Sequence, residues 1–201
     1  MSKPHNELRD TYPSQPRLTP LPLAEMSERT REVIAKNNLA PTGEPLAIFG
    51  TLARHPKLLA SWLPFGGRLL AGGSLDRRWT ELVILRTAYN MGNQYEWGQH
   101  VAISLGFGID RATIERVVVG SSAEGWSPFE ALLMQATDEL HHERYITDST
   151  WDALAQQLNE MQLIELCFLV GHYEMLAMFL RTAGVQLEAG KESLPYPDNT
   201  K

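Results

Sequence analysis

The sequence lacks several features that mark other classes of protein. It has one cysteine in 201 residues, Cys167, so no disulfide can form within one chain. No apolar run approaches the roughly 20 residues that span a bilayer, and residues 1–7 lack the apolar core of a secretory signal. No basic block is present, and the formal net charge is −6. We therefore expect a cytoplasmic protein that binds neither membrane nor nucleic acid.

Strand signals are missing as well. No stretch alternates apolar and polar residues over the length of a strand, and the turn signals fall between helical stretches. With 43% hydrophobic residues the chain can bury a core, so we expect an all-α fold. The predicted parts are a proline-rich arm with a lead-in helix (residues 1–40), a helical domain (41–188) and a disordered tail (189–201).

Proline and glycine predict where the helices break. His55-Pro56 should separate two helices, because the residue before proline is pushed out of the α region. Pro64, Gly66 and Gly67 should interrupt the helix that follows.

The most informative stretch is residues 81–100, where Glu81, Glu96 and His100 stand in an otherwise apolar context. Glu96 and His100 are four residues apart and therefore share one face of a helix. Glu81 approaches them only if the chain turns back. Gly92-Asn93 supplies that turn, because glycine weakens a helix interior and asparagine is a good N-cap. The pattern predicts a helix-turn-helix with acids on both helices.

This stretch resembles the carboxymuconolactone decarboxylase family, which includes the AhpD-type alkylhydroperoxidases. The peroxidase members carry Glu followed by Cys-x-x-Cys-x-x-x-His. Glu81 and His100 match the Glu and the His, whereas Asn93 and Glu96 occupy the two cysteine positions. The resemblance, which extends over residues 44–185, implies an AhpD-like fold and a homo-oligomer, commonly a trimer or a hexamer built from trimers.

The resemblance implies catalysis by Glu81, Glu96 and His100, without a cofactor. His100 titrates near neutrality, and Glu81 could fix its tautomer or relay its proton. The predicted substrate-binding residues are Asn93, Tyr95, Trp97, Arg86 and His172. Arg54 and His55 are further cationic candidates. We expect no metal, because the adjacent His141 and His142 point about 100° apart on a helix.

The function implied is that of a decarboxylase-like lyase, acting on a small carboxylated lactone or related organic acid, as in the degradation of aromatic compounds. One alternative is an alkylhydroperoxidase or peroxiredoxin activity, which the missing Cys-x-x-Cys disfavours. Another is a non-catalytic helical oligomer that binds a small molecule. Structural roles also stay open: Glu96 as a capping residue, His100 as a core histidine and Glu81 as a surface carboxylate.

Overall fold

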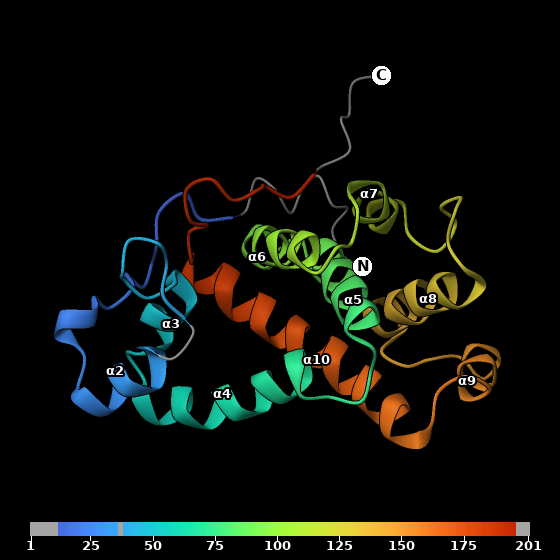
Figure 1. Ribbon diagram of the computed structural model, residues 1–201, viewed down its shortest axis with the longest axis horizontal. Coiled ribbons are helices and arrows are strands. Elements are labelled where there is room, and N and C mark those ends of the chain that lie inside the picture. The colour runs from blue at the N-terminus through green and yellow to red at the C-terminus, as the bar shows by residue number, and fades with distance from the viewer. Residues whose placement is uncertain (1–11, 36–37, 196–201) are drawn as a thin grey trace.

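The computed structural model describes residues 12–35 and 38–195, and within these ranges the fold is built from helices without a strand (Figure 1). The elements are a 3-10 turn η1 (Leu23–Glu25) and helices α2 (Glu28–Ala35), α3 (Ala47–Leu52), α4 (Pro56–Ala71), α5 (Arg77–Asn90), α6 (Gln94–Gly106), α7 (Arg111–Val119), α8 (Pro128–Glu143), α9 (Asp148–Ala155) and α10 (Glu160–Ala183). The predicted all-α class is confirmed.

Helix α5 is the centre of the fold. It contacts α6, α7, α8 and α10, and all of residues 80–90 are buried. A helix that is buried on every side lies in the core, whatever its polar content. Figure 1 shows α10 running across the molecule, with α4 on one side of it and α5 and α6 on the other. The charged residues of α5 therefore need partners inside the protein.

The predicted break between α5 and α6 is present. Gly92 has a φ of 59°, in the left-handed region that glycine adopts without strain. The Asn93 side chain accepts hydrogen bonds from the backbone N–H groups of Tyr95 and Glu96 and so caps α6. Arg181 of α10 donates to the carbonyls of Met91 and Gly92. The turn is thus held from both sides, which fixes α6 against α5.

The predicted interruption of α4 is wrong. The helix continues from Pro56 to Ala71 with Pro64 inside it. Packing outweighs the lost hydrogen bond, because Leu59 is buried in one apolar cluster and Leu69 in another. Gly66 has a packing role, since a Cβ there would lie 3.4 Å from the His172 and Trp62 rings.

Both terminal segments pack on the helices of their own chain. The backbone N–H of Arg17 donates to the Ala183 carbonyl, and that of Leu21 donates to Gly50. At the other end, Leu194 is buried in the main core, and Gly98 leaves room for the Glu192 carbonyl. The predicted disorder is therefore wrong for residues 189–195. Residues 1–11 of the predicted arm and 196–201 of the predicted tail lie outside the described residues.

Arg86 of α5 joins three helices through one guanidinium group. Its Nε lies 2.6 Å from Asp138 Oδ1 and its Nη2 lies 2.9 Å from Asp138 Oδ2, on α8. Its Nη1 donates to the carbonyls of Val117 and Val118 at α7. A bidentate pair of this kind is strong and directional.

We predict that Asp138→Asn lowers the free energy of unfolding by about 3 kcal/mol, because Arg86 then stays buried without a counter-charge. Urea unfolding followed by circular dichroism measures the change. The control is Glu192→Gln, which breaks the exposed Arg111–Glu192 pair and should cost less than about 1 kcal/mol. Equal losses for the two variants would contradict the structural role of Arg86.

Candidate active site

Glu81 and His100 lie side by side in the core, where α5 meets α6. Glu81 Oε2 is 2.8 Å from His100 Nδ1, and the Glu81 side chain has no exposed surface. The Ser104 hydroxyl donates to the same carboxylate oxygen at 3.4 Å. A carboxylate at Nδ1 favours the tautomer with hydrogen on Nδ1. The Nε2 atom of His100 is then the one available for proton transfer.

Arg77, one turn before Glu81, supplies the positive charge for this carboxylate. Its Nη2 lies 2.5 Å from Glu81 Oε1, and its guanidinium lies 4.6 Å from the centre of the Phe107 ring. Two other nitrogens of Arg77, Nε and Nη1, are buried and have no hydrogen-bond partner among the described residues. Arg77 therefore keeps donors for a further acceptor beside the Glu81–His100 pair.

Glu96 is buried in a different way. Among the described residues, neither of its carboxyl oxygens has a hydrogen-bond partner. Burial raises its pKa well above the ordinary value and so favours the protonated, neutral carboxyl. The alternative of a capping role is not realised, because the Asn93 N–H, which a reciprocal cap would use, donates to the Ala88 carbonyl.

Tyr173 of α10 closes the site from the opposite side. Its ring meets the His100 ring edge-on, with centroids 5.2 Å apart. Burial raises its pKa, and the nearby Glu81 carboxylate raises it further, as does Glu96 when it is ionised. Both acids therefore lie near one phenol. The structure thus brings Glu81 and His100 into direct contact, with Glu96 facing the same tyrosine.

Three predicted substrate-binding residues have structural partners instead. Asn93 caps α6 and donates to the Ala177 carbonyl, and Arg86 is held by Asp138. The Tyr95 hydroxyl accepts from the Ile48 N–H and donates to Glu188. Asn93, Tyr95 and Arg86 therefore contribute to the fold, and their role in substrate binding stays a prediction. The other cationic candidates are also engaged, Arg54 with the Thr19 carbonyl and His55 as the N-cap of α4.

Trp97 and His172 keep unpaired polar atoms and remain candidates. Trp97 Nε1 and His172 Nδ1 are buried without a hydrogen-bond partner in the described part of the chain, as is Trp62 Nε1. His172 stacks on Trp62, with ring centroids 5.9 Å apart, and meets Tyr173 edge-on at 5.2 Å. Burial lowers the pKa of His172 to about 4, so it is neutral at pH 7.

Sequence reasoning assigned no role to Arg77, Ser104 and Tyr173. Two of them could be found from helical spacing, since Arg77 precedes Glu81 by four residues and Ser104 follows His100 by four. Tyr173 comes from α10, far along the chain, and nothing local connects it to His100.

The side chains give little support to thiol chemistry or to a metal site. Cys167 lies half-buried on α10, where burial raises its pKa and disfavours the reactive thiolate. Within residues 12–35 and 38–195, no group of three or more His, Cys, Asp or Glu side chains could hold a metal ion. His141 instead pairs with Glu174, with Nδ1 2.7 Å from Oε1.

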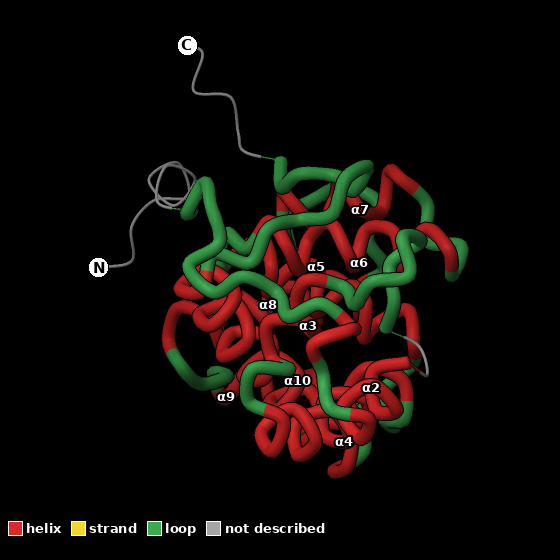
Figure 2. The backbone as a smooth tube through the Cα atoms, turned by 90° about the vertical axis from the view of Figure 1, so that its left-hand side faces the viewer, coloured by secondary structure: helices red, strands yellow, loops and turns green. Residues whose placement is uncertain are grey.

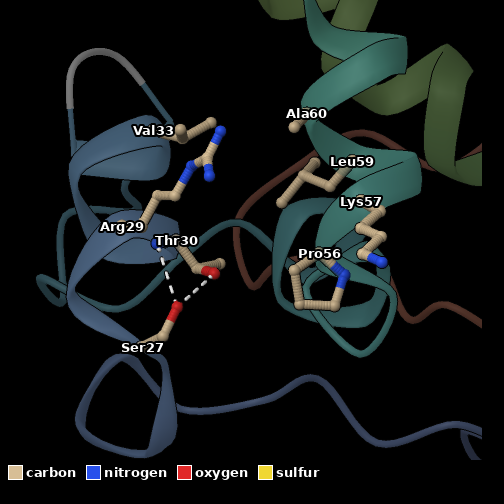
Figure 3. Close-up of a pocket in the computed structure, with 8 residues that line it drawn as sticks. All are labelled: Ser27, Arg29, Thr30, Val33, Pro56, Lys57, Leu59 and Ala60. Atoms are coloured by element: carbon tan, nitrogen blue, oxygen red, sulfur yellow. Dashed lines mark hydrogen bonds between the residues drawn. The ribbon is translucent and has the colours of Figure 1, made fainter.

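A shallow pocket elsewhere is separate from these residues. It lies between Ser27 and α2 on one side and the first turns of α4 on the other (Figure 3). Arg29 and Lys57 are among its lining residues, and none of the site residues is.

A comparison with protein families gives a match. Residues 56–139 match the carboxymuconolactone decarboxylase family. This segment is similar to that family and covers less than half of the chain. It holds Glu81, Glu96 and His100, whereas Tyr173 lies beyond it. None of the curated proteins matches the sequence.

Solved structures show an AhpD-like fold. A peroxidase-related protein from Silicibacter sp. TM1040 is 14% identical with a TM-score of 0.76, over 88% of this chain and 94% of its own. The alkylhydroperoxidase AhpD core protein from Ralstonia eutropha JMP134 is 15% identical with a TM-score of 0.74, over 86% and 93%. A variant of the debrominase Bmp8 in complex with 2,3,4-tribromopyrrole is 15% identical with a TM-score of 0.73, over 88% and 94%.

We predict that the Glu96→Gln variant gains stability relative to the native protein as the pH rises from 5 to 8. A carboxyl whose pKa is raised on folding contributes stability below its unfolded pKa and loses it as the pH rises. The relative gain is at most about 1.4 kcal/mol per pH unit. Urea unfolding at several pH values measures it.

The control for this prediction is Glu130→Gln. Burial raises the pKa of Glu130, but hydrogen bonds from Arg78 and Ser127 outweigh this and lower it overall. Its contribution is lost only in acid, so its effect on stability should stay constant from pH 5 to 8. The same flat profile for Glu96→Gln would mean that Glu96 is ionised or paired in the fold.

Proposed function

We propose that the protein is a cofactor-independent acid–base enzyme that acts on a small carboxylated lactone or a related organic acid. The observation that carries this proposal is the contrast between two buried carboxyls at one site. Glu81 is ion-paired with Arg77 and hydrogen-bonded to His100, whereas the Glu96 carboxyl has no hydrogen-bond partner among the described residues. Two acids in such different environments divide the roles of proton donor and charge stabiliser.

His100 is the proton carrier in this proposal. Glu81 holds its Nδ1 and stabilises the imidazolium that forms when Nε2 accepts a proton. Ser104 fixes the carboxylate in turn. The edge-on contact with Tyr173 restricts the rotation of the ring, so Nε2 keeps one direction.

Glu96 supplies a proton in this proposal, because burial favours its protonated form. In a decarboxylation, the carbon–carboxylate bond breaks, carbon dioxide leaves and the electron pair moves into a conjugated carbonyl of the substrate. The carbanionic carbon then takes a proton from Glu96 or from the His100 imidazolium. Glu96, left as a carboxylate in a buried site, regains its proton readily because burial disfavours the charge.

Arg77 is the cationic anchor in place of the predicted Arg86. Its unpartnered Nη1 atom can donate a hydrogen bond to a substrate carboxylate, to which the guanidinium charge adds electrostatic attraction. An anchored carboxylate would be a spectator group, since loss of carbon dioxide is easiest from a carboxylate in an apolar setting. The Tyr173 ring supplies apolar surface against His100.

The relatives in fold raise the alternative of thiol chemistry, since two of them are named for peroxidases. A thiol peroxidase needs a reactive thiolate and a resolving thiol, whereas this chain has Asn93 and Glu96 at the motif positions. The debrominase variant binds a small substituted ring. A ring of that size agrees with a lactone as the substrate here.

We predict that His100→Gln lowers turnover by about 100- to 10,000-fold, because glutamine hydrogen-bonds but does not titrate. The assay incubates the protein with a panel of small carboxylated lactones and measures carbon dioxide release and substrate loss by mass spectrometry. Unfolding curves of the variant check that the fold is kept.

The matched control is Cys167→Ala, which should leave turnover unchanged. Turnover that survives His100→Gln but is lost with Cys167→Ala would contradict the proposal and favour a thiol peroxidase. Binding of a lactone without any turnover would favour the non-catalytic binder.

A further inference from the structure

Helix α10 carries an exposed apolar stripe. Between residues 161 and 178, the exposed positions are all apolar residues or glycine: Met161, Ile164, Phe168, Gly171, Met175 and Met178. The five side chains among them are 52–67% exposed. The helix lies beside α4 and α9, in the lower half of Figure 2. Apolar surface gathered in one line is unusual for an isolated soluble protein.

The spacing of the stripe is that of a coiled-coil seam. Its residues follow one another at intervals of three, four, three, four and three, which repeats every seven residues. Such a repeat keeps one edge of a helix facing a second helix along its length. The opposite face of α10, with Leu166, Leu169 and Tyr173, is already used against the core. The seam therefore has no covering partner among residues 12–35 and 38–195.

The stripe is symmetric about its own midpoint. Met161 and Met178, Ile164 and Met175, and Phe168 and Gly171 form three pairs centred on the same point, between residues 169 and 170. A two-fold axis at that point would place each residue opposite the other member of its pair in an antiparallel copy. At Gly171 a Cβ would meet no atom within 4 Å, so there is open space for Phe168 of the copy.

We propose that two copies of this chain associate by antiparallel pairing of their α10 helices along this stripe. At about 200 Å² for a large side chain, five side chains that are more than half exposed present roughly 600 Å² of apolar surface. A standard interface buries about 800 Å² on each partner. Phe65 of α4 is 41% exposed and packs edge-on against Phe168, which extends the patch toward that size.

A lipid surface is the competing occupant, since α10 is long and apolar enough to cross a membrane by length and composition. However, 56% of its most apolar window is buried inside the molecule. The stripe is also flanked by Glu165 and Glu174, whereas helices that lie on membranes usually carry Lys and Arg beside the apolar face. These features favour a second protein helix.

The paired surface lies next to the candidate active site. Phe65 contacts Phe168 on the surface side and meets the His172 ring at 5.2 Å on the inner side. His172 in turn contacts Tyr173, which contacts His100. The copy would therefore cover the outer wall of the site and exclude water from it.

The first test measures the mass of the full-length protein by sedimentation velocity. The double variant Phe168→Glu with Met175→Glu should halve the mass of the native assembly, whether this is a dimer or a larger even-numbered assembly. The control is Val119→Glu, which adds a charge at a 62% exposed apolar residue of α7 and should leave the mass unchanged. A native protein with the mass of one chain, or a double variant of native mass, overturns the proposal.

The second test fixes the orientation and needs no loss of stability. In a Cys167→Ala background, Met161→Cys combined with Met178→Cys should give a disulfide-linked dimer on mild oxidation. Met161→Cys alone should not, because the two copies of residue 161 would be about 25 Å apart in an antiparallel pair. Efficient cross-linking by the single variant would mean a parallel pair, and flotation of the native protein with phosphatidylcholine vesicles would mean a lipid surface. Either result overturns the proposal.

Discussion

The structure depends on placing two acidic side chains where water does not reach them. A buried carboxylate is costly unless it is paired, and a buried carboxyl without a partner keeps its proton. Glu81 is a paired carboxylate, with Arg77, His100 and Ser104 as its partners. Glu96 has no partner among the described residues, and burial favours its protonated form. The same fold thus buries, where α5 meets α6, one carboxylate that is paired and one carboxyl whose protonated form is favoured.

The tight turn between α5 and α6 makes this arrangement possible. Gly92 reverses the chain in a left-handed conformation, and Asn93 caps α6 with its own side chain. Because Asn93 satisfies the first N–H groups of α6, Glu96 is not needed as a cap. In a relative with a thiol pair at these two positions, the helix start would favour a thiolate. In this chain Asn93, at the first position, accepts hydrogen bonds from the backbone of α6, and the second position holds the acid Glu96.

Local chemistry in the sequence predicted the helices, the turn and the contact between Glu81 and His100, because each depends on residues that are near one another in the chain. The wrong predictions depend instead on residues that are far apart in the chain. Pro64 stays within α4 because packing at distant residues holds the helix straight. Arg86 looked free because Asp138 is 52 residues away. Tyr173 was not assigned because only the tertiary fold places α10 beside α6. Side-chain partners far along the chain are what periodicity does not reveal.

Helix α10 shows why composition alone is ambiguous for such a protein. It is apolar on the face toward α5 and apolar again on the exposed stripe, so its pattern resembles that of a membrane span or a central core helix. The buried face is required by the site, since Tyr173 closes it. The exposed face has no such reason within one chain. A helix that contacts His100 on one side and is apolar on the other connects the interior of the site to whatever covers the stripe, so association and catalysis would share one rigid element.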